Sequence, residues 1–302
     1  MRAEELGFDS VWANDHLAPW KARRQENNDQ PLRWYEPLVT LAHCAAVTKR
    51  IRLALGVIVM PFREPVTLAV QAATLDILSG GRLVFGLGIG GSRDEMEMVF
   101  PRRAKWNRSV VLDEALESFK LLFAGGPATF EGKYYSFKGV TLAQTPLQKP
   151  LPLFISGITP SAMERVAQYA TGLMTMASPD QGLQERIDGL RKAAEKLEQN
   201  PAEIDVAVSV NLCLDTTHEG AIKKLTGSWM GRRLLPGRTR PEEFAAGQLV
   251  GTPEEAAEKI SKLGKMGVTY IVPQHIAADN IALHWEQMEL MGKGVLPLCR
   301  GL

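Results

Sequence analysis

Residues 51–88 contain the pattern that decides the fold: IRLALGVIVM (51–60), PVTLAVQAATLDIL (65–78), the pair Gly80-Gly81, and RLVFGLG (82–88). The first and last runs are almost continuously apolar, which is typical of parallel β-strands covered on both faces. The middle run begins with proline and is followed by two glycines, which favour the first turn and the end of a helix. The segment therefore predicts a strand, a helix and a second parallel strand.

The same alternation continues along the chain. Further strand-like runs lie at 8–14, 151–156, 172–177, 204–214 and 268–273. Helical patterns lie at 36–48, 109–124, 159–170 and 252–266. Strand–helix alternation repeated this often implies right-handed βαβ units in an α/β protein, here a (β/α)8 TIM-type barrel. Seven strand candidates are one short of eight, and residues 1–6 look like the tail of a helix that a strand should precede. Because an open barrel would expose two strand edges, we expect a truncated or misassigned start rather than a chain that truly lacks its first strand.

Three stretches are longer than a minimal βα unit needs: 92–108, 125–150 and 215–250. We expect them to be insertions at the rim of the barrel, where such loops usually shape or cover a site. No low-complexity linker interrupts the sequence. We therefore predict a single domain over residues 1–302.

Composition limits the possible functions. The net charge is +1, with 35 basic and 34 acidic residues and no polybasic patch, which argues against nucleic-acid binding. Cys44, Cys213 and Cys299 are scattered without metal-binding spacing, and such an odd count suits a reducing cytoplasm. No apolar run reaches membrane length. We expect a soluble cytoplasmic protein with no metal, nucleic-acid or membrane partner.

Three segments that follow predicted strands are candidates for the site, because reactive groups gather at that end of a barrel. Residues 14–20 contain Asp15 and His16, and a histidine beside a carboxylate can exchange protons near neutral pH. Residues 85–92 fit G-x-G-x-x-G, but a charged loop is expected next, so the small residues indicate close approach of a cofactor to the backbone. Residues 156–161 lead into a helix, whose N-terminus favours an anion. His275 follows the last strand and is equally consistent with a site or a loop role.

Several blocks resemble the luciferase-like monooxygenase family, in the family's order and over nearly the whole chain. They are AEELGFDSVWANDH (3–16), IRLALGV (51–57), QAATLD (71–76), SGGRLVFGLG (79–88), GKYY (132–135), PLFISG (152–157) and GTPEE (251–255). The resemblance implies a barrel oxidoreductase that uses a flavin or deazaflavin, with its active site at the carboxyl ends of the strands. It also implies that the missing first strand belongs upstream of residue 1.

The resemblance also implies residue roles. DHLAPW (15–20) is similar to the form found in coenzyme F-420-dependent sugar-phosphate dehydrogenases, which implies a catalytic His16, oriented by Asp15, with Trp20 facing the cofactor ring. Those enzymes carry a catalytic glutamate where this chain has Gly91, which argues against a sugar-phosphate substrate. The cofactor-binding residues that the resemblance implies are Val57, Ile58, Val59, Gly88, Ile89, Gly90 and Gly91 at the ring, and Ser156, Gly157, Ile158, Thr159 and Ser161 at the phosphate. A non-proline cis peptide is expected at Ile58–Val59 or within one residue of it.

The leading functional hypothesis is hydride transfer between coenzyme F-420 and a small organic substrate. One alternative is an FMN-dependent two-component monooxygenase supplied with reduced flavin by a separate reductase. Another is a non-catalytic flavin-binding or partner subunit. The family often forms dimers, so a homodimer is also an expectation.

Overall fold

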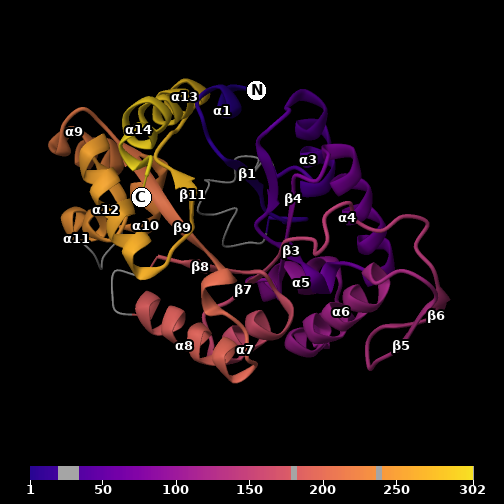
Figure 1. Cartoon of the computed structure of the whole chain (residues 1–302). Helices are drawn as coiled ribbons and strands as arrows, with labels where there is room; N and C mark the ends of the chain where they lie inside the picture. The colour runs from indigo at the N-terminus through magenta and orange to yellow at the C-terminus, as the bar shows by residue number, and fades with distance from the viewer. Residues whose placement is uncertain (20–33, 178–181, 236–239, 302) are drawn as a thin grey trace. The chain divides into compact units, whose positions relative to one another are not determined.

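The computed structural model describes residues 1–19, 34–177, 182–235 and 240–301 (Figure 1). Within them the chain forms two compact units. The N-terminal unit comprises residues 10–156 and 169–171, and the C-terminal unit comprises residues 1–9, 157–168 and 172–302. The single domain expected over 1–302 stays a prediction.

The N-terminal unit is built on a parallel sheet with the strand order β1 (Ser10–Ala13), β2 (Arg52–Leu55), β4 (Leu83–Gly88) and β7 (Leu153–Ser156), and β3 (Ile58–Val59) also pairs with β4. Its helices are α3 (Pro37–Val47), α4 (Pro65–Ser79), α5 (Arg93–Val99) and α6 (Arg108–Phe123), with 3-10 turns at Met60–Phe62 and Arg103–Lys105. An antiparallel hairpin joins β5 (Ala128–Glu131) to β6 (Ser136–Val140). The parallel pairing is that of the predicted βαβ units.

Helix α4 shows how the sequence specifies this unit. It begins at Pro65 and ends at Ser79, and the following Gly80 has a φ of 70°, the left-handed conformation that glycine adopts without strain. Leu68 and Ala72 on one face of the helix are fully buried. Phe85 of β4 is also fully buried, and its ring centre lies 5.3 Å from that of Phe119 on α6. Burial of each large side chain of this kind contributes about 1.5–3 kcal/mol, so the helix–sheet contacts fix the strands that carry the site.

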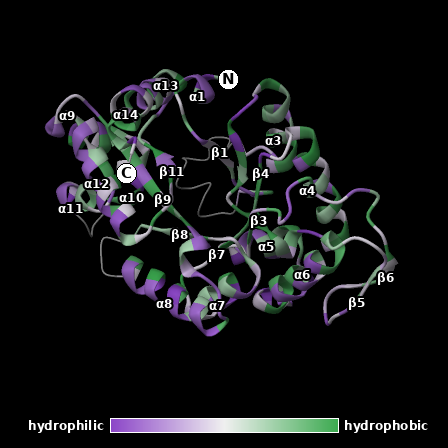
Figure 2. Ribbon diagram, viewed as in Figure 1, coloured by the Kyte–Doolittle hydropathy of each residue, from purple (hydrophilic) through white to green (hydrophobic). Residues whose placement is uncertain are grey.

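In the C-terminal unit, β9 (Asp205–Leu214) pairs in parallel with β8 (Gly172–Met176), β10 (Leu249–Gly251) and β11 (Tyr270–Ile276). Its longer helices are α7 (Pro160–Tyr169), α8 (Gly182–Lys196), α9 (His218–Gly227), α12 (Pro253–Met266) and α13 (Ile281–Glu289). The shorter ones are α1 (Arg2–Glu5), α10 (Trp229–Leu234), α11 (Pro241–Ala246), α14 (Leu296–Cys299), a 3-10 turn at Pro201–Glu203 and a π-helix at Leu290–Val295. Helices α8 and α12 alternate between hydrophilic and hydrophobic residues, as expected of helices with one buried face (Figure 2).

Each predicted strand and helix is present, with ends that differ by a few residues. The predicted capping box of α12 is confirmed: Thr252 accepts a hydrogen bond from the amide of Glu255, and Glu255 accepts one from the amide of Thr252. The run 51–60 is divided into two strands, β2 and β3. Among the described residues, no helix is both long and apolar enough to cross a membrane.

The three insertions contain more regular structure than the loops that were expected. Residues 92–108 include α5, 125–150 include the β5–β6 hairpin, and 215–250 include α9, α10, α11 and β10. The prediction of a charged loop after the glycines of β4 was therefore wrong. Ser92 caps α5 by accepting a hydrogen bond from the amide of Glu95, and this S-x-x-E start is a helix signal in the sequence.

Candidate active site

His16 lies just after β1 and forms a hydrogen-bonded pair with Glu95. The His16 Nδ1 atom is 2.9 Å from Glu95 Oε2. The other carboxylate oxygen, Oε1, accepts hydrogen bonds from the amides of Leu17 at 2.6 Å and Ala18 at 3.1 Å. The Glu95 side chain is 2% exposed and that of His16 is 26% exposed. One buried carboxylate therefore fixes both the imidazole and the loop that follows it.

The hydrogen bonds that Glu95 accepts explain its charge state. Burial acts to raise the pKa of Glu95, but hydrogen bonds from His16, Ala18 and Leu17 outweigh it and hold the pKa below its usual value. The carboxylate is thus ionised near neutral pH and can only accept hydrogen bonds, so the proton on the His16 ring lies on Nδ1. The Nε2 atom is then the ring position that can exchange a proton with a bound molecule.

Trp34 packs against the same histidine. The ring centres of His16 and Trp34 are 4.4 Å apart, and their planes meet at 27°, which is a stacked arrangement. The resemblance implied that Trp20 faces the cofactor ring, but Trp20 lies outside the described residues. The sequence analysis did not identify Trp34 or Glu95.

Asp15 does not orient His16, contrary to the prediction. Its buried carboxylate accepts a hydrogen bond from the amide of Val59 at 3.0 Å and another from Arg63 Nη2 at 2.6 Å. Burial raises the pKa of Asp15, and Arg63 and the Val59 amide only partly oppose that rise. Neighbouring side chains of an extended segment point to opposite sides, so Asp15 and His16 cannot readily face one another. Asp15 instead ties the loop after β1 to β3.

The predicted ring-binding segment packs tightly against β4. A Cβ atom on Gly88 would lie 2.7 Å from Val57 Cγ2, and one on Gly90 would lie 2.7 Å from Val59 Cγ1. These two glycines therefore accommodate side chains of the chain itself. Around Gly91 the described residues leave the Cβ position open, with nothing within 4 Å. Ile89 is half-buried, and Ile58 is fully buried, so its side chain belongs to the core.

A non-proline cis peptide joins Gly56 to Val57. Such a bond was predicted at Ile58–Val59 or within one residue of it, so its presence is confirmed but its position is two peptide bonds earlier. It lies between β2 and β3, beside the strand that carries Gly86. A Cβ atom on Gly86 would lie 1.8 Å from the Leu55 carbonyl oxygen, so this crossing of the two strands requires glycine.

The predicted phosphate-binding residues divide between the two units. Ser156 ends β7 in the N-terminal unit, whereas Gly157, Ile158, Thr159 and Ser161 lead into α7 in the C-terminal unit. The Thr159 and Ser161 hydroxyls are 3.0 Å apart, and Thr159 Oγ1 accepts a hydrogen bond from the amide of Ala162 at 3.3 Å. A Cβ atom on Gly157 would lie 2.3 Å from Ala162 Cβ, so glycine lets the loop pack directly on the helix.

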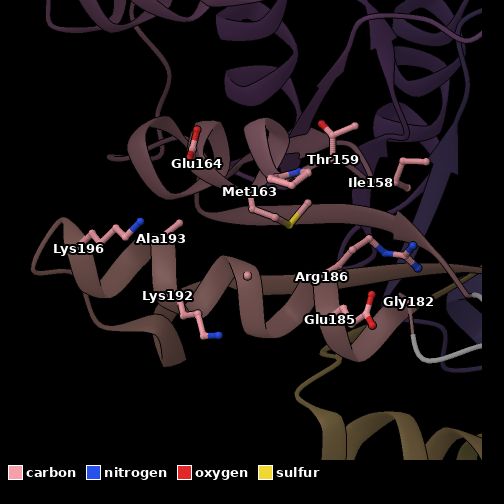
Figure 3. A pocket seen from close by; sticks show the side chains of 12 residues that line it. Ile158, Thr159, Met163, Glu164, Gly182, Glu185, Arg186, Lys192, Ala193 and Lys196 are labelled. Atoms are coloured by element: carbon pink, nitrogen blue, oxygen red, sulfur yellow. The ribbon is translucent and has the colours of Figure 1, made fainter.

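A groove of about 400 Å³ lies between α7 and α8 beside this loop (Figure 3). Ile158 and Thr159 line it from the α7 side and Arg186 from the α8 side. Arg186 donates a hydrogen bond to the Met176 carbonyl oxygen at 2.8 Å. Its buried Nε atom has no hydrogen-bond partner among the described residues. Thr159 and Arg186 bring a hydroxyl and a positive charge to the groove, and two carboxylates and two lysines also line it, so basic groups are in excess (Glu164, Glu185, Lys192 and Lys196).

Parallel strands alternate with helices in both units, and the His16–Glu95 pair lies at the end of β1. Sequence comparison identifies the family. Residues 1–270 match the luciferase-like monooxygenase family, and the chain belongs to it. It is 28% identical to the F-420-dependent glucose-6-phosphate dehydrogenase of Beutenbergia cavernae, with 99% of this chain and 91% of the relative covered.

Solved structures support the fold. An F-420-dependent secondary alcohol dehydrogenase in complex with an F-420–acetone adduct is similar at a TM-score of 0.81 and 21% identity, covering 99% of this chain and 92% of the other. The oxygenating constituent of 3,6-diketocamphane monooxygenase from Pseudomonas putida, in complex with FMN, is similar at a TM-score of 0.81 and 21% identity. The match covers 98% of this chain and 90% of the other. The predicted α/β barrel of the luciferase type is confirmed.

Proposed function

We propose that this chain is an oxidoreductase that uses coenzyme F-420 to transfer hydride to or from a small organic substrate. The names of its relatives support the cofactor, because both the glucose-6-phosphate dehydrogenase and the secondary alcohol dehydrogenase depend on F-420. The observation that carries the proposal is the pairing of His16 with the buried, ionised Glu95 at the carboxyl end of β1. This is the end of a barrel strand at which catalytic groups gather.

The donor set fits the cofactor that the family implies. The Thr159 and Ser161 hydroxyls, at the start of α7, offer donors that suit a phosphate group. Val57, Val59 and the open position at Gly91 would border the ring. When bound, the deazaflavin supplies the carbon that accepts or releases hydride.

His16 would manage the proton that accompanies hydride transfer. When a carbon bearing a hydroxyl loses hydride, that hydroxyl must lose its proton as the carbonyl forms. His16 Nε2 would take this proton, and in the reverse direction would return it. The Glu95 carboxylate, 2.9 Å from Nδ1, would stabilise the imidazolium that results. Positioned proton transfer of this kind contributes about 10²–10⁴-fold to a rate.

The substrate need not be the sugar phosphate of the relatives. Gly91 stands where the resemblance implies their catalytic glutamate, and it brings no carboxylate to the site. Glu95, four residues later, supplies a carboxylate, but binds His16 with one oxygen and the loop amides with the other. We therefore propose a small organic alcohol or carbonyl compound as substrate. We also propose that the enzyme is cytoplasmic and homodimeric.

A titration of the purified chain with coenzyme F-420 and, separately, with FMN tests the cofactor. We expect F-420 to bind at least about tenfold more tightly than FMN, a difference of about 1.4 kcal/mol. The opposite order, together with oxygen consumption in the presence of reduced FMN, would contradict the proposal and establish the two-component monooxygenase instead. A chain that binds either cofactor but turns over no substrate would match a non-catalytic flavin-binding subunit.

A further inference from the structure

Two adjacent glycines form the turn that follows β4 and precedes α5. Glycine carries no Cβ atom, so a turn of two glycines has access to many backbone conformations. Gly90 has a φ of 77°, in the left-handed region, and the Val59 side chain lies against it. Among the described residues, no atom lies within 4 Å of the Cβ position at Gly91. Such an adaptable turn keeps its open side in one orientation only if contacts from outside the turn hold it.

Arg108, the first residue of α6, makes such a contact. Its half-buried side chain donates a hydrogen bond from Nη1 to the Gly90 carbonyl oxygen at 2.7 Å. A hydrogen bond from a charged donor is roughly twice as strong as one between neutral groups. The Gly90 carbonyl and the Gly91 amide belong to one planar peptide unit, so this single bond fixes the plane that joins the two glycines. Arg108 thereby holds the turn from a point 18 positions away in the sequence.

The β5–β6 hairpin fixes the start of α6, from which Arg108 extends. Tyr134 Oη accepts a hydrogen bond from the Asn107 amide at 2.9 Å, and the Tyr134 ring stacks on that of Trp106 with centres 5.0 Å apart. Glu114 of α6 accepts hydrogen bonds from three successive backbone amides between the two strands, at 2.7 to 3.0 Å. The GKYY segment (132–135) of the sequence therefore anchors the helix end that carries the arginine.

The second tyrosine of that segment connects the same hairpin to β3. Burial raises the pKa of Tyr135, so its hydroxyl keeps the proton and donates it to the Arg63 carbonyl oxygen at 3.0 Å. The Arg63 side chain binds Asp15, whose other carboxylate oxygen accepts from the amide of Val59. Val59 is the residue that packs against Gly90. The hairpin is thus linked to the glycine turn by two routes, one through Arg108 and one through β3.

We propose that Arg108 is a positioning residue for the cofactor ring, which it acts on through the Gly90 carbonyl, and that the β5–β6 hairpin sets the place of Arg108. The inference rests on the proposed function, in which the ring lies beside Gly91. A turn that is already held in the bound orientation does not have to be ordered when the cofactor arrives, and this preorganisation raises affinity. Loss of the Arg108 contact should therefore weaken binding of the ring itself.

Titration of the full chain with coenzyme F-420, and separately with its deazariboflavin fragment, tests the inference, because the fragment has the ring but lacks the phosphate. Arg108→Gln should weaken the binding of both ligands at least about tenfold. Arg108→Lys keeps the charge and one donor of similar reach, so it should weaken them less than about threefold. Arg102→Gln is the matched control, since Arg102 is an exposed arginine of the same insertion, and should change either affinity less than about twofold.

Unchanged affinities in a folded Arg108→Gln variant would overturn the inference. A loss for F-420 that spares the fragment would also overturn it, because Arg108 would then act at the phosphate, as would equal losses in Arg108→Gln and Arg102→Gln. Thermal unfolding shows whether each variant is folded. If Arg108→Gln is not, Tyr134→Phe removes only the acceptor of the Asn107 amide and should weaken both ligands about two- to fivefold, and no change there would overturn the inference. A chain that binds FMN instead of F-420 would contradict the proposed cofactor, and the same variants titrated with FMN would still test Arg108.

Discussion

His16 and His275 each lie at or just beyond the carboxyl end of a parallel strand, but their hydrogen-bond partners are opposite in kind. The Nδ1 atom of His16 faces the ionised carboxylate of Glu95. The ring of His275 faces an arginine on Nε2 and an amide oxygen on Nδ1. A tryptophan stacks flat on the first ring, with planes 27° apart, and meets the second edge-on at 74°.

The difference indicates two uses for the same side chain. A carboxylate stabilises imidazolium, so His16 can gain and lose a proton during a reaction. His275 lies between the Arg233 guanidinium and the Asn211 amide oxygen, and neither of these two groups is a carboxylate. We therefore expect changes around His16 to lower kcat more than changes around His275.

The largest expected effect comes from the exchange of each histidine for alanine. His16→Ala should lower kcat by about 10²–10⁴-fold while F-420 affinity stays nearly constant, because it removes proton transfer and leaves the cofactor site intact. His275→Ala should lower kcat far less. Steady-state kinetics of F-420 reduction with any substrate that supports turnover distinguish the two. A kcat unchanged in His16→Ala would assign that histidine a structural role.

Loss of the carboxylate beside His16 should have the next largest effect. Glu95→Gln keeps the shape of the side chain but removes a charged hydrogen bond worth about 1.5–3 kcal/mol, so kcat should fall about 10–100-fold with little change in KM. Glu97 on the same helix is the control, because its side chain is 53% exposed and pairs with Arg93 at 2.8 Å. Glu97→Gln should leave kcat within about twofold. If the two variants lost activity equally, Glu95 would not be the residue that positions His16.

The strands, the helices and His16 could be predicted because their signals are local. Apolar runs, a proline at the start of α4 and a glycine at its end each act over a few residues. The start of α5 was also available in Ser92-x-x-Glu95, although the segment was predicted to be a loop. In a regular capping box, however, the side chain of Glu95 would have turned back to the residue at position 92.

The partner of His16 could not be found in this way. Glu95 is 79 positions away in the sequence, and only the packing of β1 beside β2 and β4 brings the two together. Adjacent Asp15 was the obvious candidate, but the alternation of side chains in an extended segment directs it to Val59 and Arg63. Trp34 lies outside any periodic pattern, so the sequence gives no sign that it stacks on His16.

The stability of the Glu95 contact should depend on pH in a predictable direction. The folded structure lowers the pKa of Glu95, so the carboxylate stabilises the fold above its unfolded pKa of about 4.3. That contribution is lost as the pH falls through the lowered pKa of the folded state. Glu95→Gln should therefore reduce the free energy of unfolding by about 1–3 kcal/mol at pH 7, and by progressively less below about pH 4. Urea denaturation at several pH values measures this difference, and an equal loss at all of them would mean that the charge of Glu95 does not contribute.

The smallest expected effect concerns the two tryptophans. An aromatic contact contributes about 0.5–1.5 kcal/mol beyond the area it buries, so Trp34→Leu should lower kcat about two- to tenfold by loosening the orientation of the His16 ring. Trp229→Leu, which removes the tryptophan that meets His275 edge-on, should leave kcat nearly unchanged. Steady-state kinetics of the two variants make the test, with Trp229→Leu as the control for Trp34→Leu. Equal losses of kcat in the two variants would mean that the stacking of Trp34 does not orient His16.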